Sequence, residues 1–171
     1  MNRRQFLKTG LIGGAILAAG GAWVVWRDIR TAEASDPPRD HLALVTRAVA
    51  PVILAGMLPG ESASREAGIG RVIDGVRTVV AAFTPAVRRE AEDLFRLLDI
   101  RTARRVLTGV SHDWPAADPA EVAAFLERWR RSPIALLQSG YFALHDLVLG
   151  AWYADASAWE AIGYAGPPNV D

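Results

Sequence analysis

Apolar residues recur every three or four positions from residue 41 to residue 153. This spacing places them along one side of a helix, whereas a strand would need alternation of apolar and polar residues. Prolines separate the periodic stretches, and no stretch alternates with period two over a useful length. The sequence therefore predicts an all-α domain, a compact irregular bundle of about five or six helices.

Local signals place the helix ends. The predicted helices are 41–57 with a kink or a break at Pro51, 64–83, 85–107 with a pause near 99–102 and a stop at Gly109, one after Asp118, and 134–153. Asp118 and Glu121 have the spacing of a capping box, in which each side chain binds the other residue's backbone. The last helix has apolar residues on most of its sides. We expect such a helix to be central in the bundle or covered by a partner.

The first residues are typical of an export signal. Arg3 and Arg4 precede Phe6, Leu7 and Lys8, and an uncharged, glycine-rich run follows from Thr9 to Trp26. This order looks like a twin-arginine leader, an address that a translocase recognises. An ordinary signal anchor with basic residues on its cytoplasmic side is the alternative. The twin-arginine route carries folded proteins, so its use indicates that something is loaded before export.

The leader divides the chain into two parts, 1–34 and 35–171. The triplet Ala32-Glu33-Ala34 allows cleavage after Ala34. Eighteen uncharged residues would span about 27 Å as a helix, close to the ~30 Å of a bilayer core, so a retained anchor is the second outcome. We expect a periplasmic protein, either released or held at the inner membrane, with a single helical domain in residues 35–171.

Composition excludes several classes of protein. Residues 35–171 carry 14 basic and 17 acidic side chains, a net charge of −3, which argues against a nucleic-acid partner. The chain has no cysteine. Disulfides, iron–sulfur clusters, thiolate zinc sites and haem attached through Cys-x-x-Cys-His are therefore excluded.

The isolated histidines and the absence of catalytic motifs in the sequence predict that the chain is not an enzyme. His41, His112 and His145 are isolated, and the neighbouring Asp113 and Asp146 are expected to point away from them. No metal-ligand spacing and no phosphate-binding glycine loop occurs. A leader for preloaded proteins on a chain with no cofactor motif suggests that the cofactor belongs to a partner. The alternatives are a stand-alone helical binding module and a small hydrolase using His112 or His145.

The C-terminus is aromatic and rich in proline and glycine. The candidate docking residues are Trp152, Tyr153, Trp159, Tyr164, Pro167 and Pro168. Gly166-Pro167-Pro168 favours turn and polyproline geometry, so this tail is not expected to form a regular element. Large aromatic side chains on such a segment pack either on the chain's own core or on another subunit, or shape the surface on which that subunit docks.

Several segments, in this order, resemble the small subunit of flavoprotein sugar and alcohol dehydrogenases, the gluconate 2-dehydrogenase subunit 3 and sorbitol dehydrogenase small-subunit group. They are the leader, Leu107-Thr108-Gly109-Val110, Phe125-Leu126-Glu127-Arg128-Trp129-Arg130 before Ser132, Trp152-Tyr153, and residues 159–168. Together they span most of the chain.

The resemblance implies a role in a membrane-associated complex. The large subunit of such complexes is an FAD-containing oxidoreductase of the glucose–methanol–choline type without a leader, and a cytochrome c subunit often accepts the electrons. The small subunit escorts the folded flavoprotein through the twin-arginine translocase and stays bound to it. It holds no cofactor and performs no redox step.

Overall fold

A computed structural model describes residues 39–159 of the chain, and within this range it is all-α. Six α-helices and three short helical segments follow one another, and no strand is present in the part described. The elements are α2 (His41–Ile53), α3 (Ser62–Ala82), α4 (Pro85–Asp99), α5 (Arg101–Ala103), the π-helix η1 (Arg104–Thr108), the 3-10 helix η2 (Trp114–Ala116), α6 (Pro119–Arg130), α7 (Ala135–Ala154) and the 3-10 helix η3 (Ala156–Ala158). The predicted fold class is confirmed.

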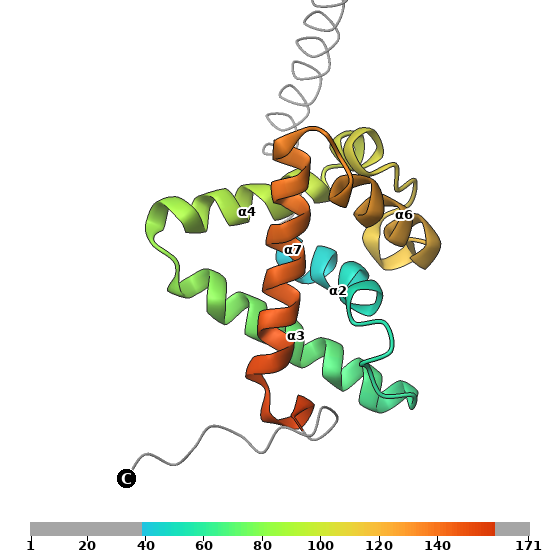
Figure 1. The fold of residues 1–171 in the computed structure, drawn as a ribbon, viewed down its shortest axis with the longest axis vertical. Helices are drawn as coiled ribbons and strands as arrows, with labels where there is room; N and C mark the ends of the chain where they lie inside the picture. Colours follow the sequence, from blue (N-terminus) through green and yellow to red (C-terminus); the bar gives the residue numbers. More distant parts are fainter. Residues whose placement is uncertain (1–38, 160–171) are drawn as a thin grey trace, which may run out of the picture. The chain divides into compact units, whose positions relative to one another are not determined.

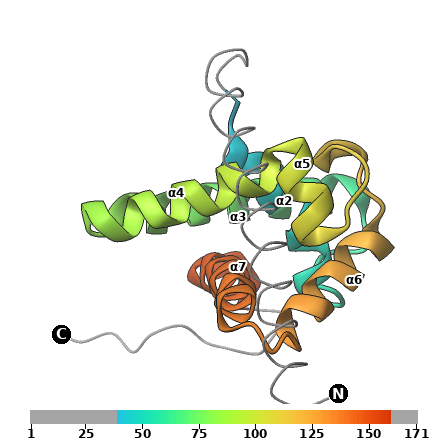
Figure 2. The ribbon, with the colours of Figure 1, turned by 90° about the horizontal axis from the view of Figure 1, so that it is seen from above.

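Helix α2 is the centre of the bundle. It contacts α3, α4, α6 and α7, and its Val45, Val49 and Ala50 are fully buried. Figures 1 and 2 show α4 and α6 on opposite sides of α2, with α7 crossing α3. One side of α7 is covered by α2, α3 and α6. Among the described helices the central place therefore belongs to α2, and whether a partner covers α7 stays a prediction.

Helix starts follow the local signals. Asp40 caps α2 by accepting a hydrogen bond from the Ala43 N–H at 3.0 Å, and Thr84 precedes Pro85 at the first position of α4. The last helix begins at Ala135, one residue later than predicted. The Ser132 hydroxyl accepts the Ile134 N–H at 3.1 Å, which holds residues 132–134 in a turn.

Two predicted details were wrong. Helix α2 ends at Ile53 and not at Met57, and Gly56, with φ +84°, lies in the turn that follows. The capping box is only half formed. Asp118 accepts the Ala120 N–H at 2.8 Å, but Glu121 turns away to accept the backbone N–H and the hydroxyl of Ser111, both at 3.3 Å. Glu121 therefore fastens α6 to the preceding loop.

The predicted interruption after α4 is present. Ile100 has extended backbone angles, α5 and η1 follow, and Gly109 ends η1 with φ +70°. That left-handed conformation favours glycine. On α4 the buried apolar residues are Phe95 and Leu98, whereas Val87 is 44% exposed.

Tryptophans join the helices within the core. Trp114, Phe125 and Trp129 form a row with ring centroids 6.2 and 5.1 Å apart. Trp114 donates its indole N–H to the Leu98 carbonyl at 3.1 Å, and Trp129 donates to the Leu107 carbonyl at 2.9 Å. These bonds satisfy carbonyls near the interruption between α4 and η1. None of the described helices is long and apolar enough to cross a membrane.

Candidate functional site

Three of the predicted docking residues lie in the described part of the chain, at the C-terminal end of α7. They are Trp152, Tyr153 and Trp159. The leader residues Arg3, Arg4, Phe6, Leu7 and Lys8 and the tail residues Tyr164, Pro167 and Pro168 lie outside the described residues. The candidate site within residues 39–159 is therefore the base of the tail, together with the surface of the helix that leads into it.

Trp152 belongs to the chain's own core. Its side chain is 5% exposed and packs over Gly68 of α3, where a Cβ would lie 3.5 Å from the indole ring. On the same side of α7, Ala151 lies against Gly75 so closely that a Cβ on this glycine would be 2.8 Å from the Ala151 Cβ. Trp152 thus packs between α7 and α3 and exposes almost none of its own surface.

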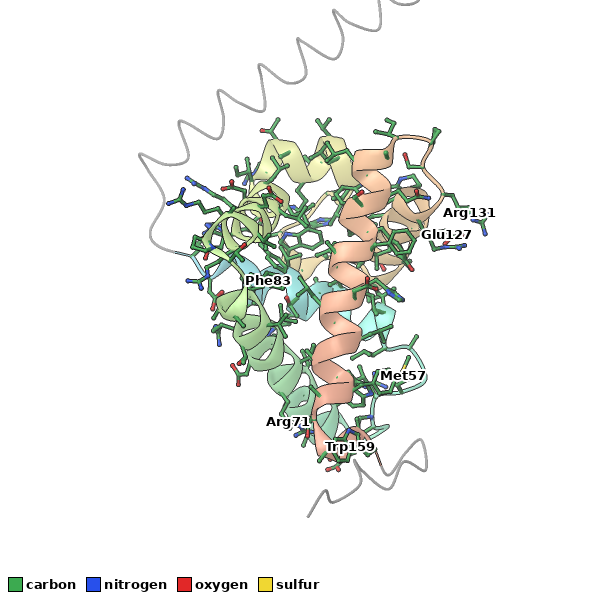
Figure 3. The ribbon with its side chains drawn as sticks, turned by 60° about the vertical axis from the view of Figure 1, so that its left-hand side comes forward. Met57, Arg71, Phe83, Glu127, Arg131 and Trp159 are labelled. Atoms are coloured by element: carbon green, nitrogen blue, oxygen red, sulfur yellow. The ribbon has the colours of Figure 1, made fainter. Side chains whose placement is uncertain are left out.

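Tyr153 is exposed, and Trp159 beside it is half-buried. Tyr153 is 40% exposed, and its hydroxyl contacts the Met57 sulfur at 3.5 Å. Trp159 donates its indole N–H to the Tyr153 carbonyl at 2.8 Å, which satisfies one of the carbonyls left free at the end of α7. Figure 3 shows Met57, Arg71 and Trp159 together at this end of the molecule. The Trp159 side chain is therefore held against the end of α7.

Asp155 fixes the turn between α7 and Trp159. One carboxylate oxygen accepts the Ser157 N–H at 2.9 Å, and the other lies 2.5 Å from Nε of Arg71 on α3. The bond from Ser157 and the nearby Arg71 guanidinium hold the pKa of Asp155 below its ordinary value, although burial works in the opposite direction. Asp155 is thus charged at neutral pH and ties the base of the tail to α3.

The histidines are placed differently from what the sequence predicted. His145 and Asp146 were expected to point apart, yet His145 Nδ1 lies 3.0 Å from Asp146 Oδ1. Their side chains are 33% and 73% exposed. Asp113, the neighbour of His112, instead pairs with Arg104 at 2.5 Å. A carboxylate beside a histidine was the requirement for the hydrolase alternative, and here the pair lies at the surface, where water screens the charges.

Sequence reasoning missed a third pair. His41 Nδ1 lies 2.8 Å from Asp99 Oδ2, although 58 positions separate the two residues. The side chain of Asp99 is only 5% exposed. The sequence offers one indirect signal, because Asp99 follows directly on the buried residues Phe95 and Leu98 of an apolar stripe. Its partner could not be named without the tertiary structure.

Arg104 is the centre of this polar cluster. Its side chain is 1% exposed and donates to the Asp99 backbone carbonyl at 3.1 Å and to Asp113 at 2.5 Å. The Asp99 carboxylate lies 4.0 Å away, and the Trp114 ring centroid lies 6.0 Å from the guanidinium carbon. These contacts join the end of α4, η1 and the loop before η2. Because the charges are paired within the chain, we interpret this cluster as a structural one that holds the end of α4 to η1.

Among residues 39–159, no group of three or more acidic or histidine side chains is arranged to hold a metal ion. No protein-family model matches the chain, and no curated protein and no solved structure matches it either.

Proposed function

We propose that the chain is the non-catalytic accessory and export subunit of a periplasmic, membrane-associated FAD-dependent sugar or alcohol dehydrogenase. FAD belongs to the partner flavoprotein, and a cytochrome c subunit is a further candidate member of the complex. The chain provides the twin-arginine address in residues 1–34 and stays bound to the flavoprotein after export. The leader motif and the resemblance of the sequence support this proposal.

The structural observation that carries it is the fixed base of the tail. Tyr153 and Trp159 are held at the surface by Met57 and by the end of α7, while Asp155 ties the same turn to α3. A docking segment that starts from a rigid base loses less conformational entropy on binding than one that starts from a mobile end. Aromatic side chains are also the commonest anchors in protein interfaces.

The first test of the escort role is whether a gene for a leaderless flavoprotein lies beside the gene of this chain, and the second is co-expression of the chain with that flavoprotein. Replacing both Arg3 and Arg4 by lysine keeps the charge but removes the twin-arginine motif. We expect the flavoprotein, followed by its FAD fluorescence and by immunodetection, to disappear from the periplasmic fraction. The matched control replaces Arg27 and Arg30 by lysine, and we expect export to continue.

Two results would contradict the proposal. The first is an active flavoprotein in the periplasm despite the lysine pair at positions 3 and 4. The second is a neighbouring gene product that neither binds flavin nor co-purifies with the chain, which would favour a stand-alone binding module.

A further inference from the structure

Helix α7 carries a second, mainly apolar stripe whose two end residues, Phe142 and Tyr153, are exposed, while Leu149 within it packs partly against the core. Phe142, His145, Leu149 and Tyr153 follow one another at spacings of three, four and four, and these spacings place them on one side of the helix. We call these four residues the outer stripe. The core side is formed by other residues, Leu144, Val148, Ala151 and Trp152. At 1.5 Å per residue, the outer stripe is about 17 Å long.

Aromatic rings make up much of this surface. Phe142 is 49% and Tyr153 40% exposed. The ring of Tyr141 lies 5.3 Å from that of Phe142 and 5.4 Å from that of His145, so three rings are in contact at the N-terminal half of the stripe. Beside it, a Cβ placed on Gly150 would meet no atom within 4 Å. This side of α7 is therefore open, in contrast to Gly140, where a Cβ would lie 2.5 Å from the Trp129 ring.

A pair of arginines stands at the N-terminal end of the stripe. Arg130 and Arg131, at the end of α6, share a single carboxylate, that of Glu127, at 2.7 and 2.5 Å. Gln138 of α7 donates its amide N–H to the Arg130 carbonyl at 3.3 Å and lies one turn before Phe142. Figure 3 shows Glu127 and Arg131 at the opposite end of α7 from Trp159. We call Arg130 and Arg131 the basic rim.

The basic rim keeps a positive charge that Glu127 does not cancel. The hydrogen bond from Arg130 lowers the pKa of Glu127, and the same bond raises the pKa of Arg130. At neutral pH two guanidinium groups therefore share one carboxylate, which leaves one net positive charge. Arg130 and Arg131 are 45% and 73% exposed, so this charge is available to a partner.

We propose that the outer stripe and the basic rim form a docking surface for the flavoprotein, whose matching surface is apolar along the stripe and acidic at the rim. This inference rests on the proposed function and adds a site that the tail does not contain. Exposed aromatic side chains beside arginines have the composition of an interface centre. The surface also leads directly to Tyr153 and Trp159, so stripe and tail base are continuous.

The charged side chains of this surface argue against a bilayer and against a second copy of the chain as its partner. A bilayer would have to dehydrate Asp146, which is 73% exposed and bonded to His145 within the stripe. A second copy packed antiparallel would bring the basic rim to the Tyr153 end, where Arg71 and Asp155 already neutralise each other. Parallel packing would bring the two basic rims together. A separate acidic partner is the occupant that complements the rim.

The test measures binding of the full chain to the flavoprotein encoded beside it. Phe142→Ala should weaken binding at least about 30-fold, as expected for an interface hot spot. Leu136→Ala is the matched control, because Leu136 is 79% exposed on another side of α7, and its effect should stay under about threefold. Arg130→Glu combined with Arg131→Glu should slow association about tenfold at low salt, with a smaller effect at high salt.

The results of these measurements distinguish the docking surface from the escort role. If Phe142→Ala binds as the native chain does, or if reversing the rim charge leaves association unchanged, the docking surface is overturned while the export result with lysine at positions 3 and 4 still supports the escort role. If the native chain forms no complex, both proposals fail. A dimer of the full chain that Phe142→Ala dissociates, or binding to phosphatidylglycerol vesicles that Phe142→Ala abolishes, would assign the stripe to another occupant.

Discussion

At the start of η1 an arginine is buried beside two carboxylates, whereas along the outer stripe of α7 aromatic rings face solvent. Arg104 is 1% exposed, and Phe142 is 49% exposed. Buried charges and exposed apolar patches are the two departures from the usual distribution that carry information. Arg104 finds its partners inside the chain, in Asp99 and Asp113. Phe142 contacts Tyr141 but keeps about half of its surface exposed, and this difference separates a residue that holds the fold from one on the proposed docking surface.

The largest effect is expected at the buried arginine. Arg104→Met removes the hydrogen bonds to the Asp99 backbone carbonyl and to Asp113, and leaves the buried Asp99 carboxylate with His41 as its partner. Removing one partner of a buried pair typically costs about 3–5 kcal/mol of the free energy of unfolding. Urea denaturation measures this cost. Arg101→Met, three residues earlier and exposed, is the control and should stay within about 1 kcal/mol of the native chain. Equal stability of the two variants would mean that the buried cluster is not needed for the fold.

The neighbouring residues Trp152 and Tyr153 allow the same comparison of a buried and an exposed side chain within α7. Trp152→Ala should lower the free energy of unfolding by about 3–5 kcal/mol, because it opens a cavity between α7 and α3. Tyr153→Ala removes a side chain that is 40% exposed and should cost under about 1 kcal/mol. Thermal unfolding of both variants checks the difference. A larger loss for Tyr153→Ala would show that the outer stripe belongs to the core.

Two glycines of α3 test how closely α7 packs on it. Gly75→Ala would place a Cβ 2.8 Å from that of Ala151, and we expect this overpacking to cost about 1–3 kcal/mol. Gly70→Ala meets nothing within 4 Å and should instead stabilise the helix by about 0.5–1 kcal/mol. Opposite signs in chemical denaturation are the expected result. Stabilisation by both substitutions would place the α3–α7 contact elsewhere.

The smallest effect concerns Asp155 and depends on pH. Its pKa is lower in the folded chain than the ordinary value near 3.9, so the carboxylate stabilises the fold above about pH 4 and loses this contribution as pH falls through the folded pKa. Asp155→Asn retains a cap for Ser157 but not the charge opposite Arg71, and should cost under about 1 kcal/mol at pH 7. In acid denaturation the difference between native and variant should shrink below pH 4. A constant difference would mean that the charge contributes nothing.

Local chemistry in the sequence predicts the helices but not their partners. Asp40, the Thr84-Pro85 pair and Gly109 act on backbone within a few residues, so the helix ends they set could be read directly. The pairing of His41 with Asp99 depends on how α2 and α4 pack, which no local pattern encodes.

The sequence likewise did not indicate which side of α7 faces the core. Its sequence is apolar on most sides, and only the packing of α3 and α6 decides that Trp152 is inside and Phe142 outside. Trp152, predicted to dock a partner or to shape the docking surface, is buried for this reason, and its role toward a partner stays a prediction.

Hydroxyl-radical footprinting of the full chain, alone and bound to the neighbouring flavoprotein, tests most directly that the two sides of α7 have different roles. Oxidation of Phe142 and Tyr153 should be high in the free chain and fall in the complex. Trp129 and Trp152, which are 4% and 5% exposed, should be protected in both states. Unchanged oxidation of Phe142 and Tyr153 in a complex that still forms would contradict the account.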